Sequence, residues 1–186
     1  MITRIVLAFF LVLFIGPTFL SDASSVQKRD HLTPQEVDLV KEAQALDKRI
    51  EVFIKAAERR LMVINNSSAA NAKQLKKDAE RWGELPNGSR ADLVADIAHI
   101  LDEAITNIDD VSARDERNPL IPKSLRKLGP SVNTILAQLK PLGAQAKSEA
   151  EVASFALLDE DAQSILEAVG KLPAEVEKKA KKNDKK

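Results

Sequence analysis

The stretch DIAHILDE, residues 96–103, places one of the two histidines of the chain among three carboxylates at helical spacing. Side chains three and four positions apart lie side by side on a helix, so His99 could share a metal ion or a proton with Asp96 or Glu103. On a helical wheel with Ile97 toward the core, His99 lies about 160° away from that direction. The same outward face carries Asp92, Asp96, Glu103 and Asp110. We therefore predict a solvated acidic face, and we assign no metal ligand.

Other reactive groups are sparse or poorly placed for catalysis. The chain has no cysteine and no Gly-x-Ser-x-Gly motif, and His31 lies near the start of the expected mature chain. A haem would need axial ligands such as Met62 and His99, and both lie on the outward faces of their predicted helices. Carboxylate runs such as residues 159–161 are typical of solvated helix faces. We predict no catalytic residue, no cofactor and no enzymatic activity.

Trp82 is the single tryptophan, and it stands where a short predicted helix stops before Gly83. A tryptophan in this position could stack on a sugar or a peptide, but a lone one at a helix end is more typical of a residue that covers a core. We adopt the second interpretation.

The elements that would carry these residues are amphipathic helices. Thr33-Pro34-Gln35-Glu36 is a helix start with a capping-box pattern, and apolar residues then recur every three or four positions. They are Leu39, Ala43, Leu46, Ile50, Phe53, Ala57, Leu61 and Ile64. This spacing predicts one helix over residues 34–64, ended by the run NNSSAAN.

Further helices are predicted over residues 72–82, from the Ser89 cap to Val111, over 121–142, and from the Ser148 cap to Leu172. The apolar rhythm from Ile121 to Leu142 runs through Gly129-Pro130, which favours one kinked helix, with a break there as the alternative. Strand-like alternation and internal repeats are not found. The sequence predicts an all-α, antiparallel four-helix-type bundle over residues 32–172, with one additional short helix.

The N-terminus has the pattern of a secretory signal peptide over residues 1–23. A basic start and an uncharged apolar run from Ile5 to Ile15 are followed by small residues, which allow cleavage after Ala23 or Ser25. An uncleaved anchor is the alternative, although 11 apolar residues are fewer than the roughly 20 that span a bilayer. Without cysteine the chain cannot be a lipoprotein. We expect a periplasmic or secreted protein.

The C-terminal segment 173–186 is rich in lysine. From Lys171 onward seven lysines oppose three acidic residues, so the remaining mature chain is mildly acidic. Lysines without interleaved aromatic residues favour weak contact with an anionic surface and no specific nucleic-acid binding. We expect a tail that is disordered or a frayed helix.

The segments KRIEVFIKAAERRL (48–61) and ADIAHILDEAITNIDD (95–110) resemble uncharacterised exported helical proteins of acidobacterial soil bacteria. The resemblance implies bacterial export and an all-helical fold, and it implies no activity or functional residue. The sequence patterns themselves favour a non-enzymatic binding or interaction role in the bacterial cell envelope, with the partner and the oligomeric state open. The alternative is a periplasmic protein that binds a metal or a small ligand on the acidic face around His99.

Overall fold

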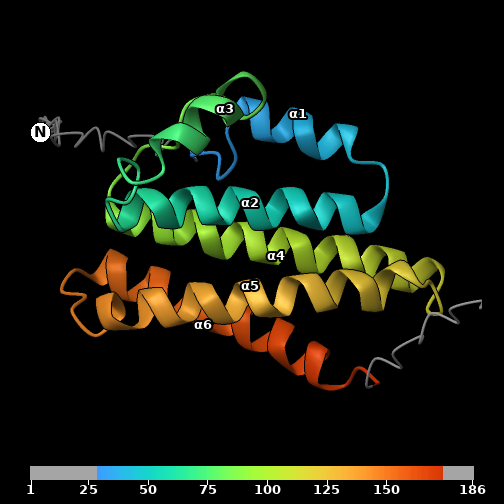
Figure 1. Ribbon diagram of the computed structural model, residues 1–186. Helices are drawn as coiled ribbons and strands as arrows, with labels where there is room; N and C mark the ends of the chain where they lie inside the picture. The colour runs from blue at the N-terminus through green and yellow to red at the C-terminus, as the bar shows by residue number, and fades with distance from the viewer. Residues whose placement is uncertain (1–28, 174–186) are drawn as a thin grey trace, which may run out of the picture.

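The computed structural model describes residues 29–173 and contains helices only in that range. The predicted signal peptide and residues 174–186 of the predicted tail lie outside the described residues. Six helices follow one another in this part of the chain, and Figure 1 shows their arrangement. They are α1 (Pro34–Glu42), α2 (Leu46–Ile64), α3 (Ala72–Trp82), α4 (Arg90–Arg114), α5 (Leu120–Gly143) and α6 (Glu149–Gly170). The predicted all-α fold is confirmed. No described helix has the length and apolar character needed to cross a membrane.

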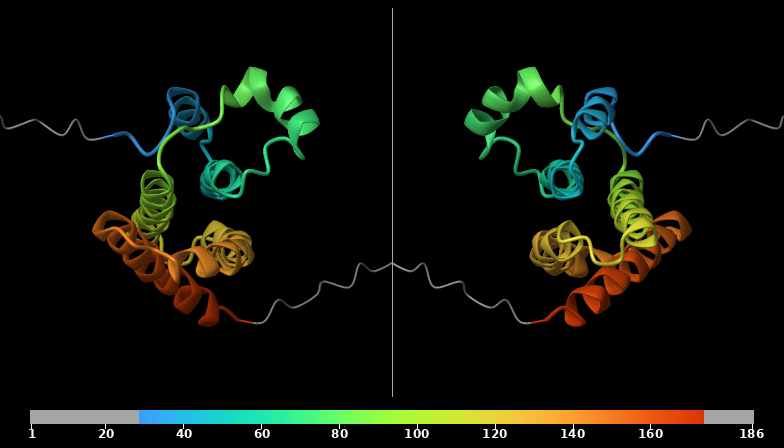
Figure 2. Two further views of the ribbon diagram at one scale, coloured as in Figure 1. Left: turned by 90° about the vertical axis from the view of Figure 1, so that its left-hand side faces the viewer. Right: turned by 90° about the vertical axis from the view of Figure 1, so that its right-hand side faces the viewer.

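Four of the helices, α2, α4, α5 and α6, form a bundle around one apolar core. The four bundle helices run in alternating directions along the chain (Figure 1). The connection after α4 crosses the bundle, so α4 and α5 lie on one diagonal, with α2 and α6 on the other (Figure 2). As a result, the neighbours α2 and α5 run in the same direction, and so do α4 and α6.

Polar contacts fix the register of the parallel pair α2 and α5. At one end the Asp47 carboxylate lies 2.8 Å from the Lys123 amine and 2.9 Å from that of Lys127. At the other end Asn65 donates to Gln138 over 2.7 Å. The two lysine hydrogen bonds lower the pKa of Asp47 to about 2, so this carboxylate stays ionised in mildly acidic solution.

The core is aliphatic, as the composition predicts. Its largest apolar side chains with almost no exposed surface are Phe53, Ile50, Ile97, Ile100, Leu101, Leu128, Ile135, Leu139, Leu158 and Ile165. All of them except Leu158 and Ile165 come from the middle of α2, α4 and α5, where the predicted apolar stripes face one another.

One helix boundary differs from the prediction. The expected helix over 34–64 is broken at residues 43–45, and α1 leaves the line of α2 to form a second layer with α3 over α2 (Figure 1). Ala45 caps α2 without a side-chain hydrogen bond. No residue in this stretch is a strong helix breaker, so the break is set by the packing of α1 on α2 and not by local propensity.

Other boundaries agree with the sequence patterns. The capping boxes at Thr33 and Ser89 are formed, and Ser148 accepts a hydrogen bond from the Glu151 backbone. At Ser148 the predicted box is incomplete in its hydrogen bonds, because the Glu151 carboxylate accepts from the Lys147 backbone instead. The helix from Leu120 is continuous through Pro130, as predicted.

Candidate functional site

Four charged side chains from three helices are buried together on the side of α2 that faces α1. This buried ion cluster consists of Glu36, Arg59, Arg60 and Asp96. Glu36 is 0 % exposed and Arg59 and Arg60 are each 1 % exposed. The Glu36 carboxylate lies 3.2 Å from Arg59 Nε and 2.8 Å from Arg60 Nη2, and it also completes the capping box with Thr33. One carboxylate therefore caps α1 and fastens it to α2.

Arg59 of α2 binds the C-terminal end of α3. Its Nη2 donates to the backbone carbonyls of Trp82 (3.1 Å), Gly83 (3.2 Å) and Glu84. The guanidinium carbon also lies 5.7 Å from the centre of the Trp82 ring, a cation–π contact. Burial lowers the pKa of Arg59, and the Glu36 charge opposes this shift. Arg59 thus fixes both the backbone and the ring of Trp82.

Gly83 makes this arrangement of carbonyls possible. Its φ of +64° is in the left-handed region, and a Cβ added there would lie 2.9 Å from the Gln35 side chain. The chain can therefore turn tightly after Trp82 and direct successive carbonyls at Arg59.

Arg60 and Asp96 hold the segment of residues 29–33, which we call the N-terminal strap. Arg60 donates to the His31 carbonyl, and its Nε lies 3.5 Å from Asp96. Arg29 donates to the same Asp96 carboxylate over 2.8 Å, and Leu32 enters the apolar core. Burial raises the pKa of Asp96, while the charges of Arg29 and Arg60 lower it. The strap is thus a structured part of the fold.

The acidic face around His99 is only partly as predicted. His99, Asp92 and Asp110 are exposed, in agreement with the helical wheel. Asp96 is 4 % exposed, so its predicted outward position is wrong. The wheel assumes a single core direction, whereas the strap covers α4 on a second side and supplies Arg29 to Asp96.

The strap also brings the second histidine to this face. His31 Nε2 lies 2.9 Å from Glu103 Oε2, and the His31 and His99 ring centres are 5.8 Å apart. Glu103 is therefore already engaged by a histidine. Within residues 29–173, no three His, Cys, Asp or Glu side chains are grouped so that they could hold a metal ion.

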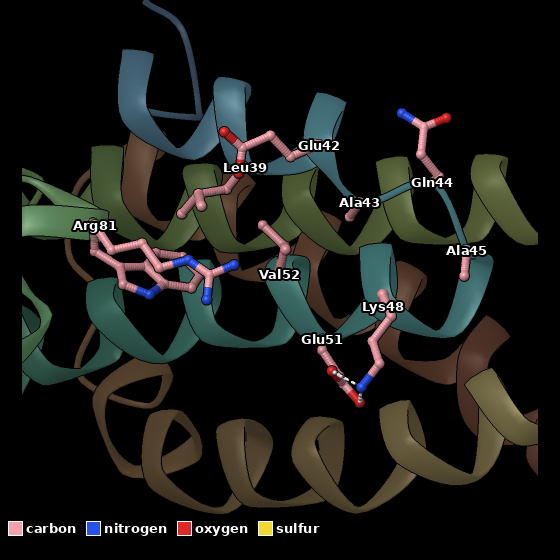
Figure 3. A pocket seen from close by; sticks show the side chains of 10 residues that line it. Leu39, Glu42, Ala43, Gln44, Ala45, Lys48, Glu51, Val52 and Arg81 are labelled. Atoms are coloured by element: carbon pink, nitrogen blue, oxygen red, sulfur yellow. Dashed lines mark hydrogen bonds and ion pairs between the residues drawn. The ribbon is translucent and has the colours of Figure 1, made fainter.

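A cleft of about 400 Å³ lies beside the break between α1 and α2, and the C-terminal end of α3 forms one of its walls (Figure 3). We call it the Trp82 cleft. Leu39 and Val52, both buried, line it together with the half-buried Trp82. Its volume is within the range of small-molecule sites, about 300–1,000 Å³. The cleft exists because the chain breaks at residues 43–45.

Charged groups of both signs line the Trp82 cleft. Lys48 is paired with Glu51, with Nζ–Oε distances of 3.0 and 3.2 Å. The hydrogen bond from Lys127 is the main cause that lowers the pKa of Glu51, and Lys48 adds to it. Arg81 and Glu42 are exposed, and neither side chain forms a hydrogen bond or ion pair with any described residue. In Figure 3 the Arg81 guanidinium is directed into the hollow, and Glu42 reaches toward the same space from the end of α1.

Trp82 was expected to cover the core, and it does pack against the core, but it also lines the cleft.

Sequence reasoning did not identify Arg59, Arg60 or Arg81. The signal for the first two was available, because Val52 and Ala56 widen the apolar face of α2 and predict that a second element covers it.

The chain was also compared with protein-family models, with curated proteins and with solved structures. None of these comparisons found a match.

Proposed function

We propose that the chain is an exported, non-enzymatic binding protein of the bacterial envelope that holds a small zwitterion, such as an apolar α-amino acid, in the Trp82 cleft. One observation carries the proposal. Arg81 and Glu42, a cation and an anion that pair with no described residue, flank a partly apolar cleft whose aromatic wall is fixed by a buried arginine.

The chemistry of the two charges suits the two ends of an amino acid. A guanidinium binds a carboxylate through two parallel N–H donors, so Arg81 would take the ligand carboxylate. Glu42 would accept from the ammonium group. Leu39, Val52 and Trp82 would contact an apolar side chain, since burying apolar surface is favourable and non-directional.

The fixed position of Trp82 supports a binding role. Arg59 and Gly83 hold the ring before any ligand arrives, so little conformational entropy would be lost when the ligand binds. A hollow of about 370 Å³ also lies beside Glu103, but there the Glu103 carboxylate is paired with His31 and the Lys41 amine with Asp38.

The test uses the fluorescence of Trp82, which is the only tryptophan in the chain. The mature protein is titrated with L-leucine, L-methionine and L-phenylalanine, and each titration is repeated by calorimetry. We expect saturable binding of at least one amino acid. The N-acetylated form and the amide of that amino acid each lack one charge. Their affinity should be lower by a factor of about ten or more.

Variants assign the charges. Arg81→Gln should weaken binding of the amino acid about tenfold but leave binding of its amide unchanged. Glu42→Gln should also weaken binding of the amino acid about tenfold, but leave binding of the N-acetyl form unchanged. The matched control Lys77→Gln removes an exposed cation from the same helix outside the cleft. Absence of binding at millimolar ligand, or equal effects of Arg81→Gln and Lys77→Gln, would refute the proposal.

Export is tested separately. Mass spectrometry of the protein from the envelope fraction of its source should give a chain that starts at residue 24 or 26. A protein found only in the cytosol with residues 1–23 intact would refute export and leave the binding experiment unaffected.

A further inference from the structure

A second surface lies on the opposite side of the bundle, between the C-terminal half of α5 and the N-terminal half of α6. There a groove of about 710 Å³ is lined mainly by aliphatic residues and Phe155. In Figure 2, α6 is inclined to the other three bundle helices. We call this surface the α5–α6 groove.

The walls of the groove are well packed. Leu139 and Leu158 are each 1 % exposed and belong to the core. Phe155 lies against the bare backbone of Gly143, where an added Cβ would be 3.1 Å from the ring. The groove is therefore a feature of the packed helices and does not depend on a loop.

An exposed aliphatic side chain lines the same groove. Val152 is 54 % exposed, and within residues 29–173 no other large hydrophobic residue is classed as exposed. Exposed apolar surface next to an apolar hollow is typical of a protein interface. Val152 and the groove therefore form one continuous apolar surface.

The charges at the groove are equal and opposite. Lys140 and Asp159 both line it and are exposed, and neither is ion-paired with a described residue. A partner with charge of one sign could match only one of them. In a two-fold symmetric pair, Lys140 meets the partner's Asp159 and Asp159 meets the partner's Lys140, so this surface is complementary to itself.

We propose that the α5–α6 groove is the interface of a symmetric homodimer. Val152 of each protomer enters the groove of the other, and the two Lys140–Asp159 pairs form at the edges. A standard stable interface buries about 800 Å² per partner, and the groove spans only about two turns of each helix, so we expect a dissociation constant in the micromolar range. The dimer leaves the Trp82 cleft open and does not depend on the proposed ligand.

The test is sedimentation of the mature protein from low to high micromolar concentration, with charge-reversal variants. Lys140→Glu and Asp159→Lys should each weaken the dimer about tenfold or more, because each places like charges opposite one another. The double variant should restore the dimer. An equimolar mixture of the two single variants should form heterodimers, detectable by native mass spectrometry, since every pair is then opposite in charge.

The controls separate the interface from general charge effects and from misfolding. Lys147→Glu changes an exposed lysine outside the groove and should leave the dimer unchanged. Val152→Asp should abolish the dimer with an unchanged helical circular dichroism spectrum. A monomer at all concentrations would overturn the proposal. A dimer that neither charge reversal nor Val152→Asp affects, or single variants that fail to pair with each other, would overturn it as well.

Discussion

The two sides of α2 are held by different interactions. The side that faces α4 and α5 is apolar in its middle, where Ile50, Phe53 and Ala57 have no exposed surface, whereas the side that faces α1 and α3 carries Arg59 and Arg60. Apolar contact is non-directional, while a guanidinium needs acceptors at fixed positions. We infer that the apolar side provides most of the stability, and that the charged side determines where α1, the N-terminal strap and Trp82 lie.

The largest effect should come from the apolar side. Phe53→Ala removes a fully buried ring and should lower the free energy of unfolding by about 4 kcal/mol. Urea unfolding followed by circular dichroism measures it. Glu58→Ala on the exposed face of the same helix should change stability by less than about 0.5 kcal/mol. Similar losses in the two variants would contradict the assignment of Phe53 to the core.

The charged side should be sensitive to the loss of its shared carboxylate. Glu36→Gln keeps the shape but leaves two buried guanidinium groups without their common anion, so we expect a loss of about 3 kcal/mol. Glu42→Gln on the same helix is the exposed control. A loss below about 1 kcal/mol would show that the cluster contributes little to holding α1.

Removing a more exposed member of the charged side should act locally. Arg29→Ala leaves Asp96 paired with Arg60 alone and should cost about 1 kcal/mol, because the Arg29 side chain is partly solvated. Hydrogen exchange should accelerate at the strap amides and stay unchanged in the middle of α4. Arg114→Ala, at the far end of α4, is the control. Uniform acceleration would indicate that the strap and the bundle unfold as one unit.

The last predicted effect depends on pH and concerns Asp161 of α6. Burial raises its pKa to about 6, with the Asp102 and Glu160 charges adding to the shift, and Oδ2 has no hydrogen-bond partner in the described part of the chain. Because the folded state binds this proton more tightly than the unfolded state, its contribution to stability falls as pH rises from about 4 to about 6.

Asp161→Asn should remove this pH dependence. We expect the variant to be more stable than the wild type by about 1 kcal/mol at neutral pH, a value reduced for solvent screening, and equally stable below about pH 4. The difference between the two urea unfolding curves at each pH is the measurement, with Asp109→Asn on the exposed face of α4 as control. A stability difference between variant and wild type that stays constant from about pH 4 to about pH 6 would contradict the prediction, because it would mean that the Asp161 carboxylate is solvated.

Much of the bundle was predictable because its helices have one core direction. The bounds of α3, the caps at Thr33 and Ser89 and the continuity of α5 through Pro130 all followed from local patterns. These features depend on residues within a few positions of one another, and capping and periodicity report such contacts directly.

The features that the sequence did not reveal depend on contacts between distant segments. Ala43, Gln44 and Ala45 are compatible with a helix, and the break there accompanies the packing of α1 on α2, where Glu36 contacts Arg59 and Arg60. The burial of Asp96 likewise requires Arg29, 67 positions earlier in the chain. The Trp82 cleft lies between elements that such contacts assemble, so the candidate site could not be derived from periodicity.

The diagonal placement of α4 and α5 has a consequence for folding kinetics. In a bundle with sequential neighbours only, adjacent helices can pair soon after they form. Here the parallel contact between α2 and α5 joins Asp47 to Lys127, 80 positions apart, so α4 and its connections lie within the loop that this contact closes. Folding rates fall as contacts become less local. We therefore expect slower folding than in an up-and-down bundle of the same length, with the hairpin of α5 and α6 forming before α5 docks on α2.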